Sequence, residues 1–192
     1  NTSMDFKIFF GLLATILALV GFWPYFRDIF KGKTKPHIYS WLVWSIIQGV
    51  GVLAMFEGGA DWGALGLGIG TLFCISIFLL SFKYGTKNIT KTDTFLLIAA
   101  LITIVVWLTL EDPLWSVVLV SLIDFIAFVP TYRKTYLAPH SETLSSYILD
   151  VVSNMFAIVA IATYSLTTTL YISSLVISNL LMVFILISRR RK

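Results

Sequence analysis

The sequence predicts an all-α integral membrane protein with seven transmembrane helices, arranged as two parallel triple-helix bundles joined by a connector helix. The composition, seven separate apolar runs and an internal repeat support this fold class. Hydrophobic residues make up 58% of the 192 residues and charged residues only 12%, about half the charged share of an ordinary soluble domain. Seven membrane spans leave no stretch for a separate soluble domain, so the function must lie within the bilayer or at its edges.

The two halves of the chain carry the same short pattern. Residues 22–27 read FWPYFR and residues 128–133 read FVPTYR, and the same offset of 106 residues pairs Gln48 with Asn154. In each copy an apolar run leads to a proline, a basic loop and a second apolar run. An internal repeat of this kind in a membrane protein is typical of transporters, whose substrate path lies between the repeats.

Seven apolar runs are each long enough to cross a membrane as a helix, at about 1.5 Å of rise per residue. The first and fifth runs end at the repeated proline motif, and the second and sixth each follow a basic loop that contains a Pro-His pair. The third is rich in glycine, which allows close helix packing, and the seventh ends at a basic tail. The predicted spans are 6–26, 36–56, 62–82, 92–110, 114–132, 143–166 and 170–188.

The fourth run has no counterpart in the repeat and is therefore predicted to be the connector. Because three spans and one connector are an even number of crossings, the two copies have the same orientation in the membrane. The predicted units are a first triple-helix bundle at 4–82, a loop and connector helix at 83–113, and a second triple-helix bundle with a basic cytoplasmic tail at 114–192.

Basic residues fall almost entirely on one side of the predicted membrane. Of the 14 lysines and arginines, all except Lys7 lie in alternate loops and in the C-terminal tail. By the positive-inside rule, this asymmetry predicts a multi-pass protein of a cell membrane, plasma or inner, with the N-terminus outside and the C-terminus in the cytoplasm. The same topology accounts for the net charge of +4, so the charge does not indicate a nucleic-acid partner.

Asp124 and Asp150 are the two charged residues predicted to lie deep in the membrane, each about 14–15 Å from the cytoplasmic side. A carboxylate in a membrane is costly unless it is paired, hydrated or protonated, and intramembrane acids are therefore candidates for function. These two acids would couple transport to protons or bind a cationic or hydroxyl-rich solute. The alternative is a protonated aspartic acid that only hydrogen-bonds between helices, and the sequence leaves both open.

The repeat also predicts a central pocket. Asp150 and Asn154 are four residues apart and share one helix face, and their repeat counterparts Trp44 and Gln48 have the same spacing. Superposing the two halves brings these faces together, which predicts a pocket with an aromatic wall, amide groups and a carboxylate. Such a lining suits a small polar solute. For Gln48 and Asn154, hydrogen bonding between helices is the alternative.

Pro24 and Pro130 occupy the same position in the two copies. Each removes a backbone donor and disturbs the helix beside it, which predicts a hinge at the cytoplasmic end of the span. The alternative is that each proline only ends its span near the interface.

These features resemble the PQ-loop superfamily, which includes the SWEET sugar transporters and lysosomal amino-acid exporters. The resemblance covers nearly the whole chain, and the chain departs from the family pattern where Tyr25 and Thr131, in place of glutamine, follow the prolines. The resemblance implies a carrier in which Pro24 and Pro130 help to open and close a cytoplasmic gate. SWEET-like proteins also bind substrate through an asparagine of the seventh span, and this corresponds to Asn179.

The sequence therefore predicts a transporter of a small polar solute, such as a sugar, an amino acid or a vitamin-like compound, that works by alternating access. Proton-coupled and passive transport both remain open, and the alternative function is a SWEET-fold receptor that binds or sorts a ligand without translocating it. No enzymatic activity, catalytic residue, metal or cofactor is expected, because both histidines lie at loop edges. The expected partners are the solute and membrane lipid, and a homo-oligomer is left open.

Overall fold

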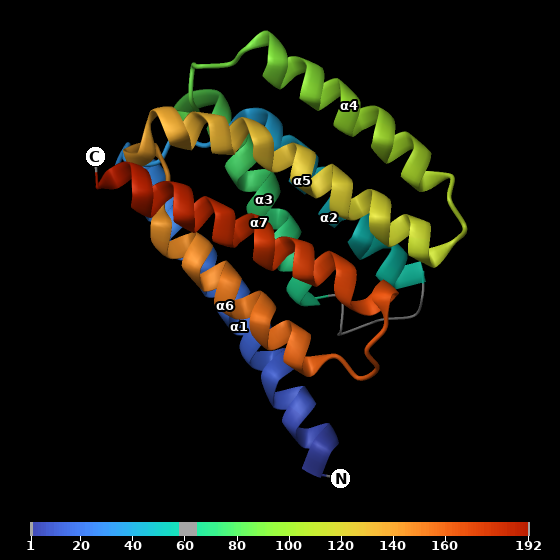
Figure 1. The fold of residues 1–192 in the computed structure, drawn as a ribbon. Coiled ribbons are helices and arrows are strands. Elements are labelled where there is room, and N and C mark those ends of the chain that lie inside the picture. The colour runs from blue at the N-terminus through green and yellow to red at the C-terminus, as the bar shows by residue number, and fades with distance from the viewer. Residues whose placement is uncertain (1, 58–64, 192) are drawn as a thin grey trace.

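The computed structural model of the protein describes residues 2–57 and 65–191 (Figure 1). This part of the chain forms seven α-helices and one short 3-10 helix, and it contains no strand, so the predicted all-helical fold with seven helices is confirmed. The elements are α1 (Thr2–Phe30), α2 (Ile38–Glu57), α3 (Leu65–Tyr84), α4 (Lys91–Leu108), α5 (Pro113–Leu137), η2 (Pro139–Ser141), α6 (Leu144–Ala160) and α7 (Leu166–Arg190).

Four of these helices, α1, α4, α5 and α7, are long and apolar enough to cross a membrane. Large apolar side chains on these helices are exposed on the surface of the protein, including Phe9 on α1, Val105 on α4 and Phe184 on α7. A soluble monomer rarely exposes apolar surface on this scale. These helices support the prediction of a membrane protein.

The helix bounds differ from the predicted spans where polar residues begin or end a helix. Helix α6 ends at Ala160 instead of 166, and α7 begins at Leu166 instead of 170. A capping box explains the start of α7: Thr168 N donates to Ser165 Oγ (3.2 Å) and Ser165 N donates to Thr168 Oγ1 (2.9 Å), and this exchange satisfies free donors of a helix start. The predicted start of the third span, at residue 62, lies outside the described residues.

The helices pack in a pattern that relates the two halves of the chain. Helix α3 contacts both α1 and α2, and α7 contacts both α5 and α6. Between these groups, α1 packs along α6 and α2 packs against α5. Helix α4 lies at the edge of the assembly, against α5 and α2 (Figure 1).

The contact between α1 and α6 is close. A Cβ atom on Gly21 would lie 3.5 Å from Leu149 Cβ, and Ser153 Oγ donates to Ala14 O at 2.8 Å. Figure 1 shows that these two helices run together and diverge from the other helices toward the N-terminal end of the chain. At the opposite end the helices share a buried apolar core, which includes Ile29 of α1 and Leu186 of α7.

Gly85, directly after α3, is a position that only glycine fits. Its N–H donates to Ser81 O (2.9 Å), and a Cβ atom there would lie 2.2 Å from Ser81 O and 2.9 Å from Pro36 O. Because both obstacles are backbone atoms, we expect Gly85→Ala to lower the free energy of unfolding by about 1–3 kcal/mol. The midpoint of thermal unfolding in detergent measures this change. Gly68→Ala is the matched control, since nothing lies within 4 Å of its Cβ position, and equal midpoints for the two variants would contradict the assignment.

Candidate functional site

A cavity of about 600 Å³ lies between α1, α2, α3, α5, α6 and α7. Its lining follows α1 from Leu12 to Tyr25, which is about 20 Å along the helix axis. Leu12 and Thr15, at one end, are exposed, whereas Tyr25, at the other end, is buried. The volume is in the range of cavities that hold small molecules.

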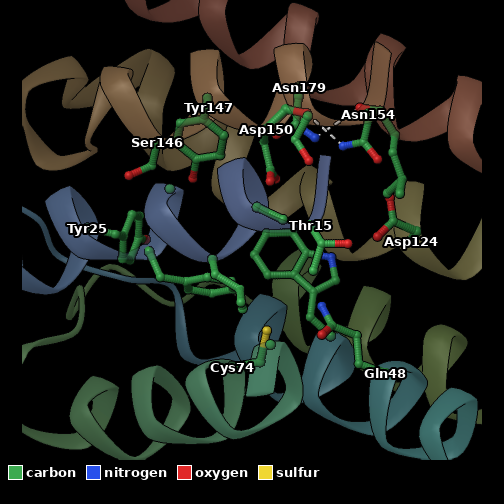
Figure 2. Close-up of a pocket in the computed structure, with 18 of the residues that line it drawn as sticks. Thr15, Tyr25, Gln48, Cys74, Asp124, Ser146, Tyr147, Asp150, Asn154 and Asn179 are labelled. Atoms are coloured by element: carbon green, nitrogen blue, oxygen red, sulfur yellow. Dashed lines mark hydrogen bonds between the residues drawn. The ribbon is translucent and has the colours of Figure 1, made fainter. Parts of the chain in front are cut away.

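Every residue that the sequence predicts to bind solute or protons lines this cavity. Helix α2 supplies two of them, α5 one, α6 two and α7 one, so both halves of the chain contribute. Figure 2 shows four of the polar ones, Asp124, Asp150, Asn154 and Asn179, on one side of the cavity and Gln48 on the other. The six residues are Trp44, Gln48, Asp124, Asp150, Asn154 and Asn179.

The two asparagines are held by their own helices. Asn154 Nδ2 donates to Asp150 O at 2.8 Å, and Asn179 Nδ2 donates to Leu175 O at 2.9 Å. Hydrogen bonding to the backbone four residues earlier fixes the amide group against its helix. For Asn154, this bond lies within α6 and uses one of its two N–H groups, so the alternative role between helices stays a prediction.

Four buried polar atoms that line the cavity have no hydrogen-bond partner among the described residues: Trp44 Nε1, Asp124 Oδ2, Ser146 Oγ and Asn179 Oδ1. Buried polar atoms are nearly always paired, and leaving one unpaired costs about 1–3 kcal/mol. Such atoms gathered around one cavity indicate that a bound molecule or water pairs with them.

Aromatic side chains form a continuous wall along the same cavity. The rings of Trp44 and Phe128 have centroids 4.8 Å apart, those of Trp41 and Trp44 are 5.0 Å apart, and those of Tyr25 and Trp41 are 5.0 Å apart. Offset and edge-to-face pairs at these distances stabilise each other. The wall joins helices α1, α2 and α5 and leads from the centre of the cavity to its buried end.

The buried end of the cavity is closed by a cluster of Tyr25, Lys134, Glu142 and Tyr147, which we call the Glu142 cluster. Tyr25 Oη donates to Glu142 Oε1 (3.2 Å) and Tyr147 Oη donates to Glu142 Oε2 (3.0 Å). Lys134 Nζ forms an ion pair with Glu142, and both side chains are at most 2% exposed. The two tyrosines line the cavity, so the cluster ties the cavity end to a buried charge pair.

Lys134 is anchored on both sides of this cluster. Its ammonium group also donates to Lys35 O (2.7 Å) and to Ser141 O (3.2 Å). Lys35 belongs to the loop before α2 and Ser141 to η2, so one side chain joins the two halves of the chain. The sequence predicts Lys134 to lie in a basic loop, and the structure shows it buried in the last turn of α5.

A second polar cluster holds the start of α4. Asp93 caps this helix together with Thr90, and Arg133 donates to both oxygens of Asp93 from Nε (3.1 Å) and Nη2 (2.6 Å). His37 Nε2 lies 3.5 Å from Asp93 Oδ2. Burial lowers the pKa of His37 to about 4, although the nearby Asp93 carboxylate raises it, so His37 is neutral at pH 7. The sequence predicts His37 at an open interface, and the structure instead buries it completely.

Pro24 and Pro130 lie inside helices and do not end them. Helix α1 continues past Pro24 to Phe30, and α5 continues past Pro130 to Leu137. The alternative role, in which each proline only ends its span, is therefore wrong for the helices themselves. Both prolines are buried, and Pro24 directly precedes Tyr25 of the Glu142 cluster.

The described residues contain no group of three or more His, Cys, Asp or Glu side chains placed to hold a metal ion. Comparisons of the chain with protein-family models, with curated proteins and with solved structures find no match. The function is therefore inferred from the chemistry of the site.

Proposed function

We propose that this protein is a carrier of a small polar solute that resembles the PQ-loop, SWEET-like transporters and works by alternating access in a cell membrane. The observation that carries the proposal is the cavity itself. Six side chains predicted from the repeat, from intramembrane charge and, for Asn179, from the family resemblance lie around one space between the two halves of the chain. A cavity with aromatic walls and a few polar groups suits a small solute, and no catalytic step is assigned to it.

The proposed architecture is two triple-helix bundles, α1 to α3 and α5 to α7, with α4 as the connector. The repeat offset relates α1 to α5 and α2 to α6, so the contact between α1 and α6 corresponds to the contact between α5 and α2. Both contacts are present. Equivalent positions also lie close together: Ser40 Oγ donates to Ala127 O (2.6 Å), and Ser146 O lies 3.8 Å from the position of a Cβ atom built on Gly21, although Ser146 Oγ has no hydrogen-bond partner among the described residues. A two-fold relation between the bundles explains both contacts.

The predicted orientation places the Glu142 cluster on the cytoplasmic side, because α1 runs from an outer N-terminus to a cytoplasmic loop. The exposed lining residues Leu12 and Thr15 then lie toward the outside. In this arrangement the structure corresponds to an outward-facing state with the cytoplasmic end closed. Alternating access requires such a state together with a second state in which the closure moves to the other end.

Pro24 and Pro130 are proposed to be the hinges for that change. Alanine restores the backbone donor that proline lacks, and proline costs a helix interior about 3 kcal/mol relative to alanine. We therefore expect Pro24→Ala and Pro130→Ala to slow transport severalfold while the midpoint of thermal unfolding stays the same or rises. Pro113→Ala, at the first turn of α5, is the matched control and should transport normally. Normal rates in both hinge variants would argue against hinges at these positions.

Reconstitution into liposomes tests the proposed function. A thermal-shift screen of sugars, amino acids and vitamin-like nucleosides first selects the compound that stabilises the purified protein most. Liposomes are then preloaded with that compound, and entry of its radiolabelled form is measured. If the protein is a carrier, exchange brings many more molecules of labelled compound into the liposomes than there are protein molecules. No entry of labelled compound would overturn the proposal.

The rival function, a SWEET-fold receptor without translocation, gives a different result in the same assay. Bound label then saturates at about one molecule per protein and does not depend on the preloaded compound. The acidic lining of the cavity disfavours a receptor for an anionic ligand such as a carboxyl terminus, since such a ligand requires basic side chains.

Asp124 and Asp150 have two uses that agree with a carrier. They bind the solute directly, or they carry a proton whose gradient drives uptake. If the carboxylates bind the solute, Asp124→Asn and Asp150→Asn should weaken solute binding. If they carry a proton, the same variants should keep solute exchange and lose only the response to a pH gradient.

A further inference from the structure

The hydrogen-bond donors of the cavity are largely used within the protein. Thr15 Oγ1 donates to Gly11 O (2.9 Å) and Ser153 Oγ donates to Ala14 O (2.8 Å). The N–H₂ groups of Asn154 and Asn179 donate to carbonyls of their own helices. Each asparagine keeps one further N–H, and the oxygens of all four side chains remain able to accept a hydrogen bond from a ligand.

One of these acceptors is buried in the cavity lining and has no protein partner among the described residues. Asn179 is 1% exposed, lines the cavity, and its Oδ1 has no partner among the described residues. Asp124, which is 3% exposed, likewise has Oδ2 unpaired. Both oxygens can only accept hydrogen bonds if the Asp124 carboxyl group is ionised, and a ligand that donates hydrogen bonds would pair with them.

The charged residues of the described cavity lining are both acidic. Asp124 and Asp150 both face the cavity, from α5 and α6, and none of the described lining residues is lysine, arginine or histidine. The nearest buried ammonium group, that of Lys134, is held by Glu142 and by two backbone carbonyls. A carboxylate in an apolar setting requires a compensating positive charge, and the cavity lining does not supply one.

The aromatic wall adds a surface that attracts cations. The electron-rich face of an indole or phenyl ring binds an ammonium group, with tryptophan the strongest. Trp41, Trp44 and Phe128 stand in contact along the cavity. Ring faces, carboxylates and amide oxygens around one space are complementary to a positively charged group attached to an apolar body.

We propose that the cavity binds a small organic cation, a protonated amine whose ammonium group lies between Asp124, Asp150 and Asn179 and whose apolar part packs on the aromatic wall. The inference rests on the proposed carrier function and narrows its solute class. A neutral sugar uses donors and acceptors equally, and an anion is repelled, so neither matches this lining as well as an amine does.

Three compounds with one skeleton test the charge of the solute. 2-Phenylethylamine is a cation at pH 7, 2-phenylethanol is neutral and phenylacetate is an anion, and binding of each to the full-length protein in detergent is measured by calorimetry. We expect the amine to bind about tenfold more tightly than the alcohol, because hydrogen bonds between charged groups are roughly twice as strong as neutral ones. Phenylacetate should not bind.

Asp124→Asn and Asp150→Asn keep the shape of the side chain and remove its charge, and each should reduce amine binding to the level of the alcohol. Glu111→Gln, an exposed acid outside the cavity lining, is the matched control and should bind the amine normally. Equal binding of amine and alcohol, binding of phenylacetate, or no binding of the amine would overturn the inference.

The failure of this inference is separable from failure of the carrier proposal. If the Asn variants keep solute exchange and lose only the response to a pH gradient, the carboxylates carry protons, the cation inference is wrong and the carrier stands. If a neutral compound exchanges across liposomes, the carrier stands and the solute class is wrong. If no compound exchanges in either direction, the carrier proposal itself fails.

Discussion

Replacing Glu142 by glutamine is expected to lower the free energy of unfolding by about 3–5 kcal/mol, because it leaves the Lys134 ammonium group buried without its counter-charge. Lys134 and Glu142 are almost completely buried, so water cannot take the place of the lost carboxylate. The midpoint of thermal unfolding in detergent measures the change.

A double variant separates the charge from the packing. Removing both members of a buried ion pair in favour of apolar side chains is often neutral for stability. Lys134→Met combined with Glu142→Leu is therefore expected to regain most of the midpoint that Glu142→Gln loses. If the single variant were as stable as the unmodified protein, the pair would have no structural role.

The Glu142 cluster has a further role if it closes the cytoplasmic end of the cavity. Loosening the cluster should favour the state that is open to the cytoplasm, because destabilising one of two states shifts the population toward the other. A cysteine at Ser146, in a Cys74→Ser background, reports this change by its reaction with an impermeant maleimide from the cytoplasmic side. Faster labelling in Glu142→Gln is the expected result, and unchanged labelling would show that the cluster does not gate access.

Asn179→Leu is expected to reduce solute transport about ten- to hundredfold and to leave the fold intact. The side chain keeps a similar branched shape but loses the oxygen that faces the cavity, and a hydrogen bond to a charged group contributes about 1.5–3 kcal/mol, where 1.4 kcal/mol corresponds to tenfold in affinity. Liposome exchange measures the loss.

The same substitution should not destabilise the protein. Asn179 Oδ1 is buried without a partner among the described residues, and replacing it by an apolar group removes that cost. The midpoint of thermal unfolding should therefore stay the same or rise. Ser188→Ala, near the other end of α7, is the control for a lost backbone hydrogen bond, because Ser188 Oγ donates to Ile185 O (3.1 Å). Normal transport by Asn179→Leu would remove Asn179 from the binding site.

Much of the candidate site was predictable from sequence because the repeat acts as a geometric constraint. A helix places residues four apart on one face, so Asp150 with Asn154 and Trp44 with Gln48 define two faces without any knowledge of packing. Intramembrane carboxylates are costly in lipid, which directs Asp124 toward the interior. These two arguments use only helix geometry and solvation, and the structure places all of these residues around one cavity.

Helix ends were less predictable, since apolar runs and helices do not end for the same reason. The predicted span 143–166 includes Ser165, which forms a capping box with Thr168, so α7 begins where the sequence predicts the end of the previous span. Conversely, α1 and α5 continue past Pro24 and Pro130, because the neighbouring turns and packing support the helix where one backbone bond is missing.

The sequence by itself determined an all-helical membrane protein and six of the side chains that line one cavity, because composition, periodicity and repeat spacing are properties of the chain alone. Only the tertiary structure decided that Lys134 is a buried partner of Glu142, that Tyr25 reaches the same carboxylate from 117 residues away, and which atoms around the cavity remain unpaired. Burial and pairing of a charge depend on what other segments bring near it, and no local pattern records those neighbours.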